Sequence, residues 1–99
     1  MKTEWWYESA IYDMDRDVVL ARLTLRDDGT AQVLTDGGEI RDFASWDEAS
    51  YWLSDEEYYP LDSLYEALAE QGVAIDPRIK PPLASCDGEL VRQMVIKLG

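Results

Sequence analysis

The N-terminal half of the chain alternates apolar and polar positions with the two-residue period that is typical of β-strands. Asp27-Asp28-Gly29 and Asp36-Gly37-Gly38 interrupt this alternation, and both contain residues that tolerate the positive φ of tight hairpin turns. Such short connections predict an antiparallel meander in chain order. The predicted strands are residues 4–12, 18–26, 30–35 and 39–43.

Both faces of the first two predicted strands carry large apolar side chains. In the first strand Trp5 and Tyr7 point to one side, while Trp6 and Tyr12 point to the other. In the second strand we place Val19, Ala21, Leu23 and Leu25 toward the core, and Val18, Leu20, Arg22, Thr24 and Arg26 away from it. At least part of one aromatic set is therefore expected to lie outside the core.

The pattern then changes to a helical period. Ser45 and Glu48 form an S-x-x-E capping box, in which each side chain is expected to bind the other's free backbone donor. Apolar residues follow at helical spacing, and the polar run from Ser54 ends the helix. The apolar positions of this helix are Trp46, Ala49, Trp52 and Leu53.

A second helix is predicted to begin near Pro60, because proline is well tolerated in an opening turn. Gly72 is a natural C-terminal stop. Between them Leu61, Leu64, Tyr65 and Leu68 give one apolar face. The C-terminal residues 89–98 satisfy both a helical and a strand pattern, and we favour the helix while keeping the strand as the alternative.

These elements predict an α+β domain spanning residues 1–99. We expect a four-stranded antiparallel meander sheet with two or three helices packed on one face. A chain of 99 residues can bury roughly two-thirds of its unfolded surface without disulfides or metals, and the apolar fraction of 46% is ordinary for a folded protein.

Charge is the most unusual property of the chain, whose formal net charge is −12. Residues 42–76 hold ten acidic residues and neither lysine nor arginine. Such a chain is repelled by nucleic acid and by anionic membrane surfaces, so direct binding to either is not expected. A basic protein surface would attract it.

The second predicted helix contains the most regular acidic pattern. Asp62, Glu66 and Glu70 recur every four residues, which stacks their carboxylates about 6 Å apart along one helix face. An ordinary solvated face and a contact stripe for a basic partner both account for this pattern. The preceding acids and tyrosines extend the candidate docking surface, because tyrosine is common at interface hot spots. The whole predicted surface is Asp55, Glu56, Glu57, Tyr58, Tyr59, Asp62, Glu66 and Glu70.

Few types of catalytic or metal chemistry fit this composition. Histidine is absent and Cys86 is the single cysteine, which excludes histidine-dependent triads and zinc sites with several Cys or His ligands. No phosphate-binding glycine motif occurs, so we expect neither an enzyme nor a cofactor. Asp13, Asp15 and Asp17 resemble the start of a calcium loop, but Val18 and Thr24 replace the required Gly and Glu.

Our leading hypothesis is a non-enzymatic binding domain that engages a basic protein surface, as an inhibitor or regulator. In one version, its carboxylates mimic the phosphates that a nucleic-acid-binding protein recognises. The alternatives are a small accessory subunit that docks through an aromatic sheet face, with Trp6, Tyr12 and Leu20 exposed, and a weak divalent-metal-binding domain. The single cysteine and the polar N-terminus fit the cytoplasm.

Overall fold

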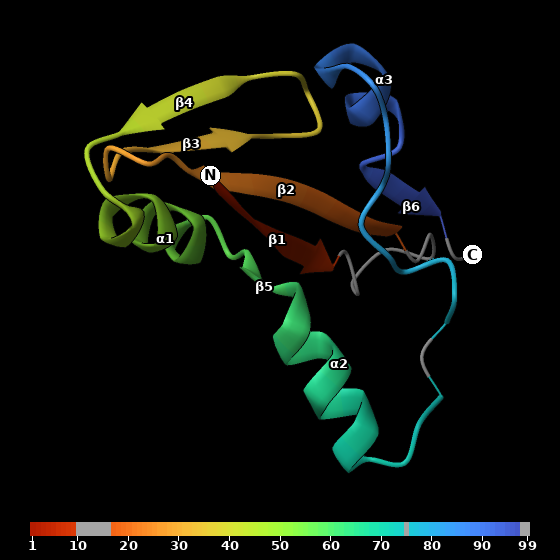
Figure 1. Cartoon of the computed structure of the whole chain (residues 1–99). Coiled ribbons are helices and arrows are strands. Elements are labelled where there is room, and N and C mark those ends of the chain that lie inside the picture. Colours follow the sequence, from red (N-terminus) through yellow and green to blue (C-terminus); the bar gives the residue numbers. More distant parts are fainter. Residues whose placement is uncertain (10–16, 75, 98–99) are drawn as a thin grey trace.

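The computed structural model describes residues 1–9, 17–74 and 76–97, and it contains a six-stranded antiparallel sheet flanked by helices (Figure 1). The main path of the sheet runs in the order β4-β3-β2-β1-β5, so the first four strands form the expected meander. The α+β class and the antiparallel sheet are thereby confirmed, with six strands in place of four. The strands are β1 (Lys2–Ser9), β2 (Asp17–Leu25), β3 (Ala31–Leu34), β4 (Ile40–Phe43), β5 (Tyr59–Pro60) and β6 (Val95–Lys97).

Asp and Gly residues form the two hairpin turns as expected. Gly29 and Gly38 adopt φ values of 90° and 80°, which favour glycine. In the first turn the Asp28 carboxylate accepts hydrogen bonds from both the backbone N–H and the hydroxyl of Thr30, at 2.9 and 2.6 Å. These local bonds set the register of β2 against β3, in which Leu23 lies opposite Val33.

The long strand β2 pairs with three other strands. Along one edge it pairs with the whole of β1. Its other edge is divided, because Arg22–Leu25 pairs with β3 and Asp17–Val19 pairs with β6. Both additional strands pair with residues far away in the sequence. The sequence did not predict β5, whereas β6 lies in the segment for which a strand was the alternative to the favoured helix.

Helix α1 (Trp46–Asp55) begins at the predicted capping residue. The Ser45 hydroxyl accepts a hydrogen bond from the Glu48 backbone N–H at 3.2 Å. The Glu48 carboxylate accepts one from the backbone N–H of Ala44, also at 3.2 Å, where the sequence predicted the N–H of Ser45. Ala49 and Leu53 are buried from solvent and attach α1 to the sheet.

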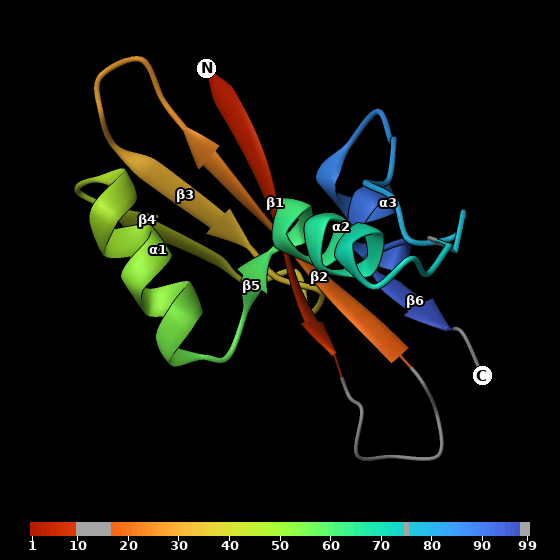
Figure 2. The same cartoon turned by 90° about the horizontal axis from the view of Figure 1, so that it is seen from below.

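Apolar residues are buried on both faces of the sheet, which differs from the predicted packing of all helices on one face. Helix α1 covers the face that contains Trp6 and Leu23. Helix α3 (Asp87–Arg92) and the chain leading to it cover the face that contains Leu20 (Figures 1 and 2). The physical reason is that β1 and β2 carry large apolar side chains on both sides, and each side must be covered.

Helix α2 (Leu61–Glu70) projects away from the sheet (Figure 1). Leu61 is its one buried residue, whereas Leu64, Tyr65 and Leu68 are half-buried. The Tyr65 hydroxyl donates to the backbone carbonyl of Ile79 at 2.9 Å, which ties the helix to the returning chain. Gly72 ends the helix with φ 68°, as predicted.

The C-terminal segment contains both a helix and a strand, because α3 ends at Arg92 and β6 starts at Val95. Leu90 and Met94 are buried on the Leu20 face of the sheet. The backbone carbonyl of Met94 accepts a hydrogen bond from the N–H of Leu20 at 2.7 Å. The favoured single helix over residues 89–98 is therefore corrected: the segment turns at Gln93 so that its last residues can pair with β2.

Candidate functional site

Three carboxylates gather at the C-terminal end of α1, and we call Asp55, Glu56 and Glu57 the linker acids. The negative end of a helix dipole disfavours acids, and the last turn of α1 contains no basic residue. Glu57 also adopts φ 65°, a left-handed conformation that costs a non-glycine residue roughly 1–2 kcal/mol. The stability of the helix therefore does not explain these residues.

Two of the linker acids, Glu56 and Glu57, lie close to the carboxylate of Glu8. The pKa of Glu8 is raised by burial first, and then by the charges of Glu57, Asp36 and Glu56. Acids from β1, from the turn after β3 and from the end of α1 are therefore close enough to repel one another. Like charges in one region destabilise the fold unless a partner neutralises them.

The two tyrosines after the linker acids have different environments. Tyr58 is only 7% exposed and packs against the Trp6 face of the sheet, so its ring is not available to a partner. Burial raises the pKa of Tyr58 to about 12, and the charges of Glu8, Asp36 and Glu56 add to this. Tyr59 is 56% exposed, and its ring centroid lies 6.0 Å from that of Tyr7.

The predicted acidic face of α2 is exposed to solvent in the structure. Asp62, Glu66 and Glu70 are all exposed, and at four-residue spacing they lie along one side of the helix. We call these three residues the α2 stripe. The last turn of α2 contains no basic residue, and Pro60 provides no side-chain cap at its start.

Few of the acids between residues 42 and 76 have a basic partner. Asp42 pairs with Arg26 at 2.7 Å, and Asp76 pairs with Arg78 at 2.6 Å. Hydrogen bonding and the charge of Arg78 lower the pKa of Asp76 to about 2. Within residues 1–9, 17–74 and 76–97, the other eight make no salt bridge: Asp47, Glu48, Asp55, Glu56, Glu57, Asp62, Glu66 and Glu70.

The structure divides the predicted docking surface into two patches. The linker acids lie at the end of α1, near Glu8, and the α2 stripe follows the projecting helix (Figure 1). The short strand β5, with the exposed Tyr59, connects the two patches. Seven of the eight predicted docking residues are exposed, and Tyr58 is the exception.

The aromatic sheet face predicted as an alternative docking surface is covered where the structure describes it. Trp6 is 4% exposed and Leu20 is fully buried, because helices lie over both faces. The predicted Tyr12 lies outside the described residues, as do Asp13 and Asp15 of the calcium-like sequence. The part of the chain that the structure describes contains no group of three or more residues able to hold a metal ion.

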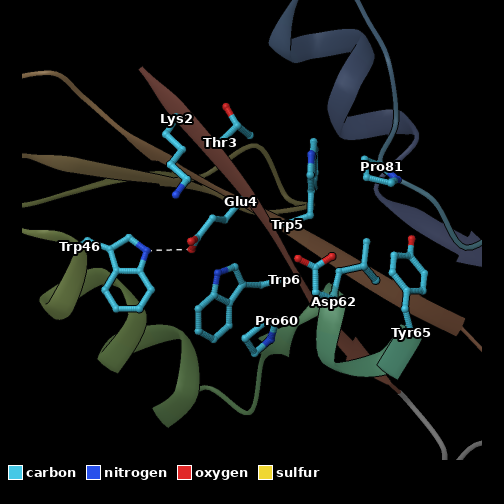
Figure 3. Close-up of a pocket in the computed structure, with 11 residues that line it drawn as sticks. Lys2, Thr3, Glu4, Trp5, Trp6, Trp46, Pro60, Asp62, Tyr65 and Pro81 are labelled. Carbon is cyan, nitrogen blue, oxygen red and sulfur yellow. Dashed lines mark hydrogen bonds between the residues drawn. The ribbon is translucent and has the colours of Figure 1, made fainter. Parts of the chain in front are cut away.

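A pocket of about 410 Å³ lies beside the start of α2 (Figure 3). The consecutive residues 2–6 of β1 all line it. Because successive residues of a strand point to opposite faces, a pocket that all five line must lie along the edge of the strand. Trp46 closes the pocket on the α1 side, while Asp62, Tyr65 and Pro81 line it on the α2 side.

Three of the aromatic side chains that line the pocket have polar groups in different hydrogen-bonding states. The Trp46 ring N–H donates to the Glu4 carboxylate at 2.8 Å. The Tyr65 hydroxyl is already bound to the carbonyl of Ile79. The ring N–H of Trp6 is buried and has no acceptor among the described residues. Trp5 and Trp6 are adjacent in the sequence, but no local pattern predicts that they line one pocket with Trp46 and Asp62.

Comparisons with protein-family models, with curated proteins and with solved structures find no match for this chain. None of the helices in the described residues combines the length and the apolar character that crossing a membrane requires.

Proposed function

We propose that this chain is a non-enzymatic binding domain that engages a basic protein surface through the linker acids and the α2 stripe. One observation carries the proposal: the eight carboxylates between Asp47 and Glu70 have no basic partner in the described structure. Two of the three other possible explanations, aromatic docking and metal binding, gain no support from the described residues. The third, an ordinary solvated face, is addressed by the experiment below.

The positions of these acids support binding more than solubility. Asp55, Glu56 and Glu57 lie at the end of α1 where the helix dipole opposes them, and Glu57 has an unfavourable backbone conformation. Solubility alone would be served equally well by acids at favourable positions. Features that oppose local stability are concentrated at functional sites in natural proteins.

The proposal is tested with a capped octapeptide of alternating arginine and lysine, titrated into isotopically labelled protein. We expect amide shifts at residues 55–57, 59, 62, 66 and 70, and affinity that falls strongly between about 50 mM and about 300 mM salt because exposed charges are screened. The double variant Glu66→Gln/Glu70→Gln should bind roughly tenfold more weakly, since each exposed ion pair contributes up to about 1 kcal/mol.

A charge-matched control separates local contact from general attraction. Asp27→Asn/Glu89→Gln removes the same charge from exposed positions outside both patches. It should reduce affinity less than threefold, because only the long-range field changes. Equal losses for the two double variants, or binding that ignores salt, would contradict the proposal and leave the acids as a solvated face.

The version in which carboxylates mimic phosphates has a separate test. The α2 stripe spaces its charges about 6 Å apart along the axis, in a row that an extended set of basic side chains could follow. A basic partner recovered with this protein should then release DNA or RNA when the domain is added. A partner that binds the domain and nucleic acid simultaneously would exclude mimicry without excluding the binding function.

A further inference from the structure

The outer edge of β1 is only partly covered. Strand β5 pairs with Trp6 and Tyr7 alone, whereas β2 pairs with all eight residues of β1 on the other side. No other strand of the described structure pairs with the outer edge of Lys2–Trp5. An uncovered edge presents backbone N–H and C=O groups that another extended chain can bind.

The pocket of Figure 3 lies along this uncovered edge. Residues 2–6 of β1 form its floor, and Pro60 of β5 lies at one end. The pocket therefore continues along the same edge of β1 with which β5 pairs. A volume of about 410 Å³ is enough for a few residues of extended peptide, because it lies within the range of ordinary ligand pockets.

The side chains of the pocket suit a cation that has an apolar stem. Glu4 and Asp62 place carboxylates on its two sides, and Trp5 and Tyr65 are half-buried aromatic walls. A guanidinium group stacks on aromatic rings and binds carboxylates with paired hydrogen bonds, so arginine fits this combination best.

One of the residues that line the pocket has a buried hydrogen-bond donor without an acceptor among the described residues. Trp6 is 4% exposed, and its ring N–H has no partner in the described chain. Figure 3 shows this nitrogen on the edge of the ring that faces Glu4. Because a buried donor without an acceptor destabilises the protein, a carbonyl oxygen supplied by a bound peptide would remove that cost.

We propose that the uncovered edge of β1 binds an extended, arginine-containing segment of a partner protein. The segment adds as a strand beside β1, on the edge where β5 pairs. Its arginine side chain lies between the aromatic walls and the carboxylates of Glu4 and Asp62. One of its carbonyl groups accepts a hydrogen bond from the Trp6 ring N–H. This inference rests on the proposed function, from which it takes the basic character of the partner. Asp62 belongs to both surfaces, but the contact inferred here is strand addition to the edge of β1.

Charge argues for a basic partner in place of a second copy of the chain. A net charge of −12 on each copy opposes edge-to-edge pairing of two identical molecules. Lys2 is the one basic residue that lines the pocket, and Figure 3 places its amine on the Trp46 side, away from Asp62. The α2 side of the pocket is therefore anionic.

The probe is the capped pentapeptide Ac-Thr-Arg-Val-Arg-Thr-NH2, compared with the same peptide in which citrulline replaces both arginines. Binding of the arginine peptide should move the indole N–H resonance of Trp6 and should slow hydrogen exchange at alternate amides of residues 2–5. The citrulline peptide has the same shape and no charge, so we expect at least tenfold weaker binding.

Two neighbouring acids on α2 provide matched variants. Asp62→Asn removes the carboxylate that lines the pocket, and Glu66→Gln removes one charge a turn further along the same exposed stripe. We expect Asp62→Asn to weaken the arginine pentapeptide at least threefold and Glu66→Gln to weaken it less than twofold. Both positions are exposed, so both variants should fold.

The inference is overturned if the Trp6 resonance does not move or if the citrulline peptide binds equally well. It is also overturned if sedimentation shows that the protein alone is a dimer and hydrogen exchange shows that its amides 2–5 are already protected. The two proposals fail separately. Equal octapeptide losses in the two double variants, with intact pentapeptide binding, would remove the linker acids and the α2 stripe as the docking site. A selective octapeptide loss in Glu66→Gln/Glu70→Gln, with no pentapeptide binding, would remove the edge of β1.

Discussion

Helices α1 and α2 each contain ten residues, yet they have different roles in the fold. Helix α1 has a side-chain cap and two fully buried residues, Ala49 and Leu53. Helix α2 has no side-chain cap and a single buried residue, Leu61. Helix α1 is therefore part of the hydrophobic core, whereas α2 projects from the sheet and its outer face can vary at little cost to the fold.

The largest expected effect comes from shortening an apolar side chain that packs one of the two helices against the rest of the domain. Leu53→Ala in α1 should lower the free energy of unfolding by about 3 kcal/mol, because it leaves a cavity at a fully buried site. Leu68→Ala in α2 should cost about 1 kcal/mol or less, because that side chain is only half-buried. Urea denaturation measures both, and equal losses would show that α2 is as integral as α1.

The segment between the helices gives a pH-dependent effect. The pKa of Tyr58 is about 12 in the folded protein and 10.0 without its surroundings, so folding favours the neutral phenol. The stability from this residue is complete below pH 10 and is lost as the pH rises toward 12. Relative to Tyr58→Phe, the wild-type protein should lose roughly 2 kcal/mol of unfolding free energy by pH 12. Parallel stability curves for the two proteins would contradict the raised pKa.

The C-terminal ends of the two helices share one hydrogen-bond pattern with different residues at the left-handed position. Tyr58 N–H binds the carbonyl of Leu53 at 2.8 Å, and Val73 N–H binds that of Leu68 at 2.9 Å. The left-handed residue is Glu57 in α1 and Gly72 in α2.

Exchanging these residue types should give effects of opposite sign. Glu57→Gly should stabilise the protein by about 1 kcal/mol, because the backbone strain and one repelling charge are removed. Gly72→Ala should destabilise it by about 1 kcal/mol through the backbone alone, since no atom lies within 4 Å of an added Cβ. Thermal unfolding measures both changes. The same sign for both would show that the left-handed backbone conformation does not determine how these substitutions change the stability of the protein.

The smallest expected effect concerns the α2 stripe. Glu66→Gln should stabilise the protein by a few tenths of a kcal/mol, because it removes repulsion from Asp62 and Glu70 four residues away on the same face. The same variant should weaken the basic octapeptide. A gain in stability together with a loss in binding would indicate that the α2 stripe is retained for function. A loss in stability would indicate a structural role.

Local chemistry determined which parts of this fold could be predicted. Asp28 and Gly29 form their turn with immediate neighbours, and Ser45 caps α1 through a residue three positions away, so these elements follow from short stretches of sequence. The exposure of the α2 stripe to solvent follows in the same way from the helical spacing of its residues.

Long-range pairing determined which parts could not be predicted. Strand β6 is extended because it pairs with Asp17–Val19, and residues 89–98 taken alone fit a helix as well as a strand. Leu20 looked exposed by alternation, and it is buried because α3 covers that face. The pocket combines β1, α1, α2 and Pro81, which no local pattern brings together.

The divided edge of β2 has a consequence for how the chain assembles. Its contact with β3 joins residues that are close in the sequence, whereas its contact with β6 joins Val18 to Ile96. Closing so long a loop carries a large entropic cost and slows folding. During synthesis on the ribosome, the β1–β2 hairpin can form early, but its Asp17–Val19 margin stays unpaired until Val95–Lys97 has emerged. Until then, this margin is open to mispairing with other extended segments.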